Sequence, residues 1–203
     1  ILLLIAIFTG VHFLNDKKSI VQDNEFKTDI NVDGWLKITK IYEYDGKLAV
    51  EAENVSDIDV EYALLTVKNK NDSYTFNVSA LLRGTKVALI CNEEVGFNSN
   101  ETYTGWQTEN IINFKKTPVM NDDKYKVSVT DGSISIKNVS GEDIASDILI
   151  YYKEKRDDIL NGSVTHRIRV SGLKADSQTY VKANDLNESN CQIIFTDYDE
   201  KKV

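Results

Sequence analysis

The chain has 203 residues, of which 41% are hydrophobic and 28% charged, and its net charge is −8 at pH 7. This length suits one or two globular domains of about 100 residues each, and the charged residues are too well mixed with apolar ones for general disorder. The acidic balance disfavours nucleic acid and anionic lipid surfaces as partners, because both attract clustered Lys and Arg.

The first fourteen residues, Ile1 to Leu14, contain no charged side chain, and a charged run follows at 16–18. As a helix they would be about 21 Å long, short of the roughly 30 Å hydrocarbon core, so a full span needs further apolar residues upstream. We expect residues 1–16 to be a membrane-anchor helix that is truncated upstream. A cleaved signal peptide, for which no small-residue cleavage pattern follows, and a buried core helix are the alternatives.

Beyond a linker expected at residues 17–33, one pattern occurs twice, which indicates an internal repeat. Each copy opens with a short apolar strand and reaches an Asp-Gly pair, Asp45-Gly46 in the first copy and Asp131-Gly132 in the second. Asp-Gly between alternating runs predicts a tight hairpin, since glycine accepts the positive φ that the turn requires. The alternation resumes after each turn, and this period of two predicts half-buried strands.

The repeat continues after the hairpin. Both copies reach the same tripeptide, Asn54-Val55-Ser56 and Asn138-Val139-Ser140, whose side chains suit a turn. Further strands are expected at 60–68 and 74–79 in the first copy, and at 148–153 and 164–171 in the second. A last apolar strand carries each cysteine region, at 86–91 and 191–195. This alignment leaves residues 98–114 without a counterpart in the second copy.

Many short strands, polar turns and no amphipathic helix beyond the leader predict antiparallel β-sandwiches. Pro118 and the polar run at 121–123 break the pattern and predict a boundary between the copies. The expected parts are an anchor at 1–16, a linker at 17–33, a first sandwich at 34–116, a linker at 117–124 and a second sandwich at 125–203.

The order of strand, Asn-x-Ser, acidic turn, apolar strand and Leu-x-x-Gly-like turn resembles the FxLYD-type and related immunoglobulin-like domains of bacterial surface proteins. The residues that carry the resemblance are Asn54-Val55-Ser56 with Leu81 and Gly84, and Asn138-Val139-Ser140 with Tyr151-Tyr152 and Leu173. The resemblance implies an all-β chain of two tandem immunoglobulin-like antiparallel β-sandwiches, preceded by an N-terminal apolar helix of transmembrane type. It implies a spacer or binding module outside the membrane and no catalytic residue.

The sequence contains no recognisable catalytic, cofactor-binding or metal-binding motif. It has no G-x-S-x-G, no phosphate-binding glycine loop and no calcium-loop spacing. His166 alternates with apolar residues, which favours a structural role at the edge of the core. Cys91 and Cys191 are too few for a disulfide scaffold and either pair with each other or remain buried thiols. Tyr103 and Trp106 are the candidates for binding a partner, with packing as the alternative.

We therefore expect a non-enzymatic protein without cofactors, held in a bacterial cell membrane by its N-terminal helix, with the bulk of the chain outside. Its sandwiches would position loops for other proteins or surface polymers, not for nucleic acid. One alternative is a subunit of a pilus-like surface filament, a homo-oligomer whose apolar helix packs in the fibre core. Residues 1–14 lack the glutamate that such a helix carries in type IV pilins. An accessory subunit of a larger membrane complex and an unrecognised hydrolase are the remaining alternatives.

Overall fold

The computed structural model describes residues 25–70, 72–183 and 185–199. These residues form β-strands and no helix, so the all-β fold class is confirmed for this part of the chain. The strands are β1 (Glu25–Val32), β2 (Leu36–Tyr44), β3 (Lys47–Asn54), β4 (Val60–Asn69), β5 (Asp72–Leu81), β6 (Lys86–Ile90), β7 (Thr104–Asn113), β8 (Tyr125–Thr130), β9 (Ser133–Asn138), β10 (Asp147–Arg156), β11 (Ile159–Asn161), β12 (His166–Val170), β13 (Gln178–Lys182) and β14 (Cys191–Asp199).

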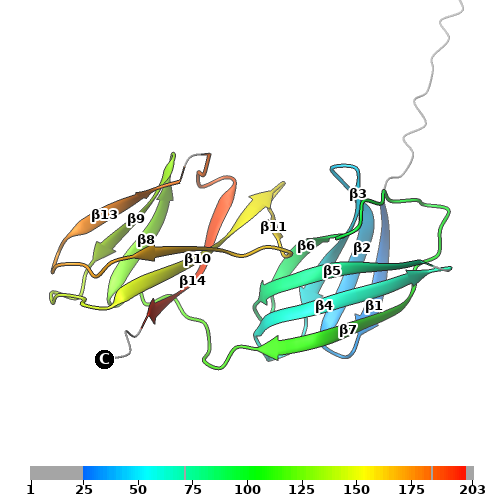
Figure 1. Cartoon of the computed structure of the whole chain (residues 1–203), viewed down its shortest axis with the longest axis horizontal. Helices are drawn as coiled ribbons and strands as arrows, with labels where there is room; N and C mark the ends of the chain where they lie inside the picture. The colour runs from blue at the N-terminus through cyan, green and yellow to red at the C-terminus, as the bar shows by residue number, and fades with distance from the viewer. Residues whose placement is uncertain (1–24, 71, 184, 200–203) are drawn as a thin grey trace, which may run out of the picture.

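The strands gather in two halves that lie side by side along the long axis of the molecule (Figure 1). In the first half, β1-β2-β3-β6 lie on one side of a hydrophobic cluster and β5-β4-β7 on the other. In the second half, β8-β9-β13 and β12-β10-β14 enclose a second cluster. We call β1–β7 the first half and β8–β14 the second half.

The two halves repeat one sheet topology. The order β2-β3-β6 recurs as β8-β9-β13, and the order β5-β4-β7 recurs as β12-β10-β14. The strand at 86–90 therefore corresponds to β13, not to residues 191–195, and the sequence alignment of the two cysteine regions is wrong. Residues 104–113, assigned no counterpart, form β7 and correspond to β14. The match escapes notice because β7 is almost entirely exposed, whereas β14 is apolar and partly buried.

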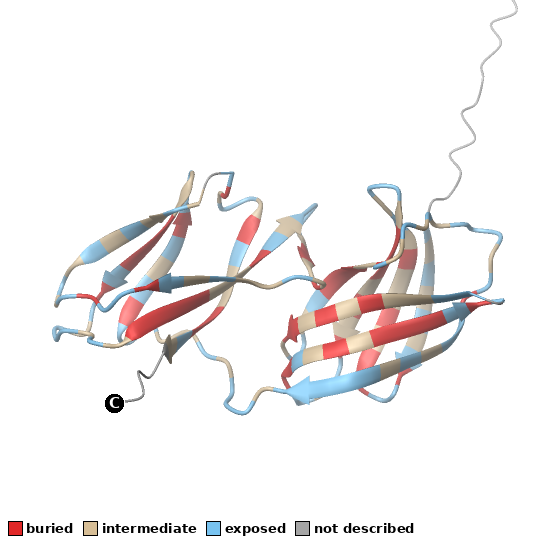
Figure 2. Ribbon diagram, viewed as in Figure 1, coloured by how far each residue is buried: buried red, intermediate tan, exposed pale blue. Residues whose placement is uncertain are grey.

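The period-two alternation decides which side chains enter the core. In β3, Leu48, Val50 and Ala52 are fully buried, and in β9, Ile134 and Ile136 are fully buried. Figure 2 shows this alternation as bands of buried residues across the central strands of each half. Such burial contributes roughly 1.5–3 kcal/mol for each large aliphatic side chain.

The linker expected at 17–33 is wrong for its second part, because residues 25–32 form β1 against β2. Phe26, Ile30 and Val32 turn toward the first cluster, and Glu25 and Asp29 point outward. The alternation that produces this strand is visible in the sequence. The anchor expected at 1–16 lies outside the described residues. We found no helix capable of crossing a bilayer within the part of the chain that the structure describes.

The Asn-Val-Ser tripeptide of the first half ties β3 to the loop that follows it. Asn54 is fully buried, and its Nδ2 donates to Ile58 O at 2.8 Å and to Leu81 O at 3.1 Å. Its Oδ1 accepts from Ser56 N at 3.0 Å and from Ser56 Oγ at 2.8 Å. The amide thus satisfies buried backbone groups that the sheet ladders leave without partners.

The second half repeats this arrangement, with one further hydrogen bond from Asn138 Nδ2 to Lys174 O at 3.1 Å. Asn138, also fully buried, donates from Nδ2 to Glu142 O at 2.6 Å and to Leu173 O at 3.3 Å. Its Oδ1 accepts from Ser140 N at 2.9 Å and from Ser140 Oγ at 2.8 Å. The shared tripeptide therefore marks the same structural position in both halves, and it aligns β3 with β9 residue by residue.

Candidate functional site at the junction of the two halves

Segment 159–165 of the second half lies along an edge of the first half, and we call it the joint. Its strand β11 pairs in parallel with β6, with Leu160 opposite Val87. Gly162 N then donates to a β6 carbonyl at 2.7 Å, and Gly162 O accepts from Ser79 N of β5 at 2.9 Å. Because β6 and β5 belong to opposite sheets of the first half, the joint bridges both sheets and covers their edges.

Gly162 allows this close approach. A Cβ atom at this position would lie 2.4 Å from Val87 Cγ2 and 2.7 Å from Leu89 Cδ2, well inside van der Waals contact. Two residues earlier, Leu160 is only 7% exposed and belongs to the hydrophobic cluster of the first half. The second half therefore contributes a side chain to the core of the first, and any side chain at 162 would push the two apart.

Lys153 of β10 forms hydrogen bonds to the joint through its terminal amine. Its side chain is buried, and its Nζ donates to Ser79 O at 2.6 Å, Asn161 O at 3.1 Å and Val164 O at 3.2 Å, with Gly162 O at 3.5 Å. Burial lowers the pKa of Lys153 to about 7, because the charged amine is removed from water. The amino group of Lys153 thus connects a carbonyl of the first half to the carbonyls of the joint.

Two polar contacts flank this buried centre. Thr165 Oγ1 accepts from Ser79 Oγ at 3.0 Å. On the far side, the guanidinium of Arg156 binds Asp45 and lies 5.1 Å from the ring centre of Tyr44. The side chains of Arg156 and Asp45 are more than half exposed, so solvent screens this ion pair and it contributes little to stability. The buried centre, not the rim, therefore dominates the stability of the junction.

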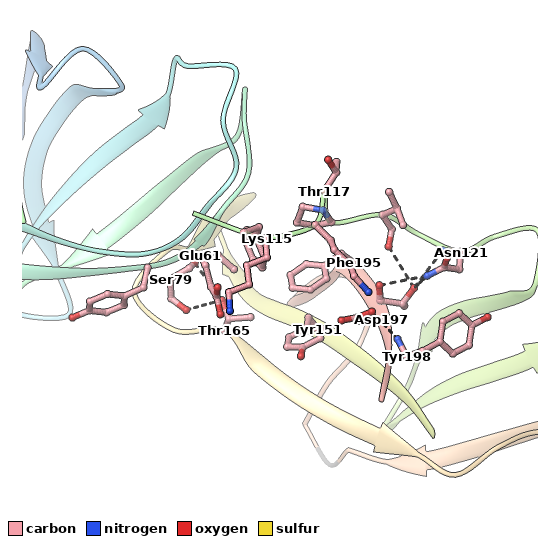
Figure 3. Close-up of a pocket in the computed structure, with 17 residues that line it drawn as sticks. Glu61, Ser79, Lys115, Thr117, Asn121, Tyr151, Thr165, Phe195, Asp197 and Tyr198 are labelled. Carbon is pink, nitrogen blue, oxygen red and sulfur yellow. Dashed lines mark hydrogen bonds between the residues drawn. The ribbon is translucent and has the colours of Figure 1, made fainter. Parts of the chain in front are cut away.

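A cleft of about 840 Å³ opens beside the joint, between the two halves and the connecting residues 114–121 (Figure 3). Its aromatic part comes from three segments: the ring centre of Phe195 lies 4.2 Å from that of Tyr151 in a stacked arrangement and 5.3 Å from that of Phe114 in an edge arrangement. The volume falls within the usual range of about 300–1,000 Å³ for small-molecule sites.

The connecting residues that form the outer wall are tied to β14. Val119 forms a bridge with Thr196, and Asn121 Nδ2 donates to Thr196 Oγ1 at 3.1 Å and to Tyr125 Oη at 3.2 Å. The linker expected at 117–124 is thus partly paired with the second half. These contacts narrow the range of positions that the wall of the cleft can take.

The chemistry of the cleft is that of hydrogen bonding and stacking. Its charged lining residues are Glu61, Lys115, Lys116 and Asp197, and no His or Cys lines it. No group of His, Cys, Asp and Glu within residues 25–70, 72–183 and 185–199 could hold a metal ion. The cleft can therefore bind, but its lining offers no nucleophile activated by a neighbouring histidine or metal.

Tyr103 and Trp106 lie at the far side of the first half, away from the cleft. Tyr103 is 7% exposed, and its ring centre lies 6.4 Å from those of Phe26 and Phe97. Trp106 packs partly against the first cluster, and its Nε1 donates to Tyr103 O at 3.3 Å. Packing accounts for Tyr103, which leaves little surface for a partner, and binding by Trp106 stays a prediction.

The cysteines and His166 occupy structural positions. Cys91 and Cys191 are buried free thiols in different clusters, and burial raises their pKa to about 12 and about 11. His166 stacks on Tyr152 with ring centres 5.0 Å apart, and its Nε2 lies 3.5 Å from Glu154 Oε1. None of the three lines the cleft.

Sequence reasoning missed the residues of the junction. Lys153 stands at the end of an apolar run, where a lysine normally marks the return to solvent. Gly162 stands in an Asn-Gly-Ser triplet that indicates an ordinary turn. The one available signal was β11 itself, a short apolar pair, Ile159-Leu160, inside a polar loop. No family model, curated protein or solved structure matches the chain.

Proposed function

We propose that the chain is a non-enzymatic, membrane-anchored extracytoplasmic protein that presents two immunoglobulin-like domains as one stiff arm. The N-terminal apolar segment would hold the arm at the bacterial membrane. The outer faces and loops of the arm would meet other proteins or surface polymers.

The joint is the observation that carries this proposal. Two domains that need no fixed orientation can be joined by a flexible linker, because domains with a small interface usually move relative to each other. Here the chain returns from the second half to pair with β6, to bury Leu160 in the first core and to place Lys153 among carbonyl groups of both halves. Such contacts favour a fixed orientation, which a spacer or display protein requires.

The non-enzymatic part of the proposal rests on the chemistry of the cleft. Acid–base or nucleophilic catalysis needs a reactive group held within hydrogen-bond reach of its partner. Among the lining residues, Ser79 with Thr165 and Asn121 with Thr196 form hydrogen bonds between hydroxyl and amide groups, and Asp197 Oδ1 accepts from the backbone N–H of Tyr198.

Spin labels at two exposed positions test the stiffness of the arm. Cysteines replacing Asp57 and Glu188 place one label on each half, and the native cysteines are buried. We expect one narrow distance distribution, and a broad one after Gly162→Ala. Gly96→Ala is the matched control, because its Cβ would meet nothing closer than 3.4 Å. A wild-type distribution as broad as that of Gly162→Ala would overturn the stiff arm.

Protease treatment of intact bacterial cells tests the location. We expect the two halves to be cleaved on whole cells or after opening the outer envelope only. Cleavage that appears only once the cytoplasmic membrane is dissolved would place the halves inside and refute the extracytoplasmic part of the proposal.

A further inference from the structure

The sheet β8-β9-β13 turns one face to the core and the other to solvent. Strand pairing sets the outer side chains in three rows, each crossing the three strands. The rows are Gln178, Lys137 and Lys126; Tyr180, Ser135 and Ser128; and Lys182, Ser133 and Thr130. Seven of these nine residues are exposed, and the other two, Ser133 and Ser135, lie in the central strand. We call these nine residues the outer grid.

The outer grid is basic on an acidic protein. Three of its nine side chains are lysines and none is acidic, although the chain as a whole carries −8. Lys137 and Lys182 form no ion pair within the described residues. Lys126 Nζ lies 3.8 Å from Asp122 Oδ1, and both of these side chains are more than half exposed, so solvent weakens the ion pair.

The equivalent face of the first half is neutralised. There Lys37 pairs with Asp29 at 2.9 Å. Lys86 likewise pairs with Glu51 at 3.1 Å. Because Asn54 and Asn138 align the two strands, Glu51 of β3 stands where β9 has Ser135, and Glu53 stands where β9 has Lys137.

The two halves thus share one face geometry and differ in its charge. In the first half, the central strand carries the two carboxylates at 51 and 53, and the added strand β1 supplies further ones at 25 and 29. The second half has no counterpart of β1, and its central strand carries a serine and a lysine instead.

The outer grid also holds an aromatic platform. Tyr180 is 62% exposed, the largest exposed fraction among the large hydrophobic side chains of the described residues. It lies in the middle row opposite Ser135, whose Oγ is 2.8 Å from Ser128 Oγ. Ser135 is itself only 4% exposed, so the middle row offers the ring of Tyr180 and the hydroxyl of Ser128, and the rows on either side offer ammonium groups.

We propose that the outer grid binds an acidic polysaccharide, a chain of sugar rings that carry carboxylates. A sugar ring presents C–H bonds that stack on the face of Tyr180, and its hydroxyls exchange hydrogen bonds with Ser128 and Thr130. Lys137 and Lys182 are four residues apart in register on neighbouring strands, about 13 Å, which lets them hold carboxylates on different sugar units. This proposal rests on the proposed function and specifies the class of surface polymer that the protein would bind.

Other anionic partners fit this surface less well. A polyphosphate or a polyglutamate chain would use the lysines but has no ring to place against Tyr180. An anionic membrane would need an apolar side chain that inserts between lipids, and the outer grid holds none besides Tyr180.

Titration with polygalacturonate tests the proposal on the full 203-residue chain. We expect saturable binding that weakens as salt rises, since screening shortens the reach of exposed charges to about 10 Å at 0.1 M ionic strength. Lys137→Glu with Lys182→Glu should weaken binding at least tenfold, and Tyr180→Ala should weaken it severalfold at unchanged charge. The milder pair Lys137→Gln with Lys182→Gln serves if the first pair lowers the thermal midpoint.

The matched control uses the other half. Lys37→Gln with Lys86→Gln, on the neutralised face, should leave binding unchanged. Equal binding of polyglutamate, no binding of polygalacturonate, or equal losses from the two lysine pairs would each overturn the proposal. The spin-label distances between the halves separate the two proposals: lost binding on a stiff arm refutes only the polysaccharide, and retained binding on a flexible arm refutes only the stiffness.

Discussion

Replacing Asn54 by Asp tests the buried turn that both halves share. The substitution keeps the size and shape of the side chain but exchanges its two N–H donors for an oxygen. The carbonyls of Ile58 and Leu81 then lose their hydrogen bonds and face an acceptor instead. An unsatisfied buried polar group costs about 1–3 kcal/mol, so two of them predict a loss of about 2–6 kcal/mol.

The placement of the tryptophans makes this loss easy to assign. Trp35 and Trp106, the only two in the chain, both belong to the first half. Fluorescence during urea unfolding therefore reports the first half, and far-ultraviolet circular dichroism reports both. With a urea m value of about 2 kcal/mol/M, a loss in the middle of this range should lower the fluorescence midpoint of Asn54→Asp by about 2 M.

Asn138→Asp provides the comparison in the second half. It should lower the midpoint of the circular dichroism transition and move the fluorescence transition less, to the extent that the joint couples the halves. Asn100→Asp, at an exposed position, is the neutral control. A fluorescence midpoint unchanged by Asn54→Asp would refute the assignment of the buried amide as the element that holds this turn.

Two further predictions concern titratable groups. The pKa of Lys153 is depressed from 10.5 to about 7 in the folded chain, so between these pH values the unfolded chain binds more protons and the free energy of unfolding rises with pH. From pH 7 to 9 the wild type should gain about 2–3 kcal/mol of unfolding free energy relative to Lys153→Met. A difference in urea midpoints between the two proteins that stays constant over this pH range would contradict the prediction. Cys91 and Cys191 are buried with raised pKa values, so at pH 8 we expect them to react with a disulfide reagent only as the chain unfolds, and rapid labelling of the native protein would show that one of them is accessible.

Local pattern was enough to predict most of the strands and the turns between them, but it assigned β1 to a linker and did not predict β11 or β13. Alternation placed residues 48–52 correctly, and the shared Asn-Val-Ser tripeptides occupy equivalent buried turns. These features are readable because the side chain period of a strand and the hydrogen bonds of a turn involve residues close in sequence. The correspondence of β7 with β14 was not readable, because equivalent strands can differ in burial and share only their neighbours in the sheet.

The junction was decided by tertiary structure alone. Lys153 and Ser79 are 74 residues apart, and nothing near either residue indicates that the amine of one will meet the carbonyl of the other. The same holds for Gly162, because the atoms that a Cβ there would overlap belong to Val87 and Leu89, which are distant in the sequence. The sequence determined the period of each strand and hence which apolar side chains of a strand share one face. Which edges meet, which lysine is buried and which face stays basic depend on contacts between distant segments, which exist only once both sheets have formed.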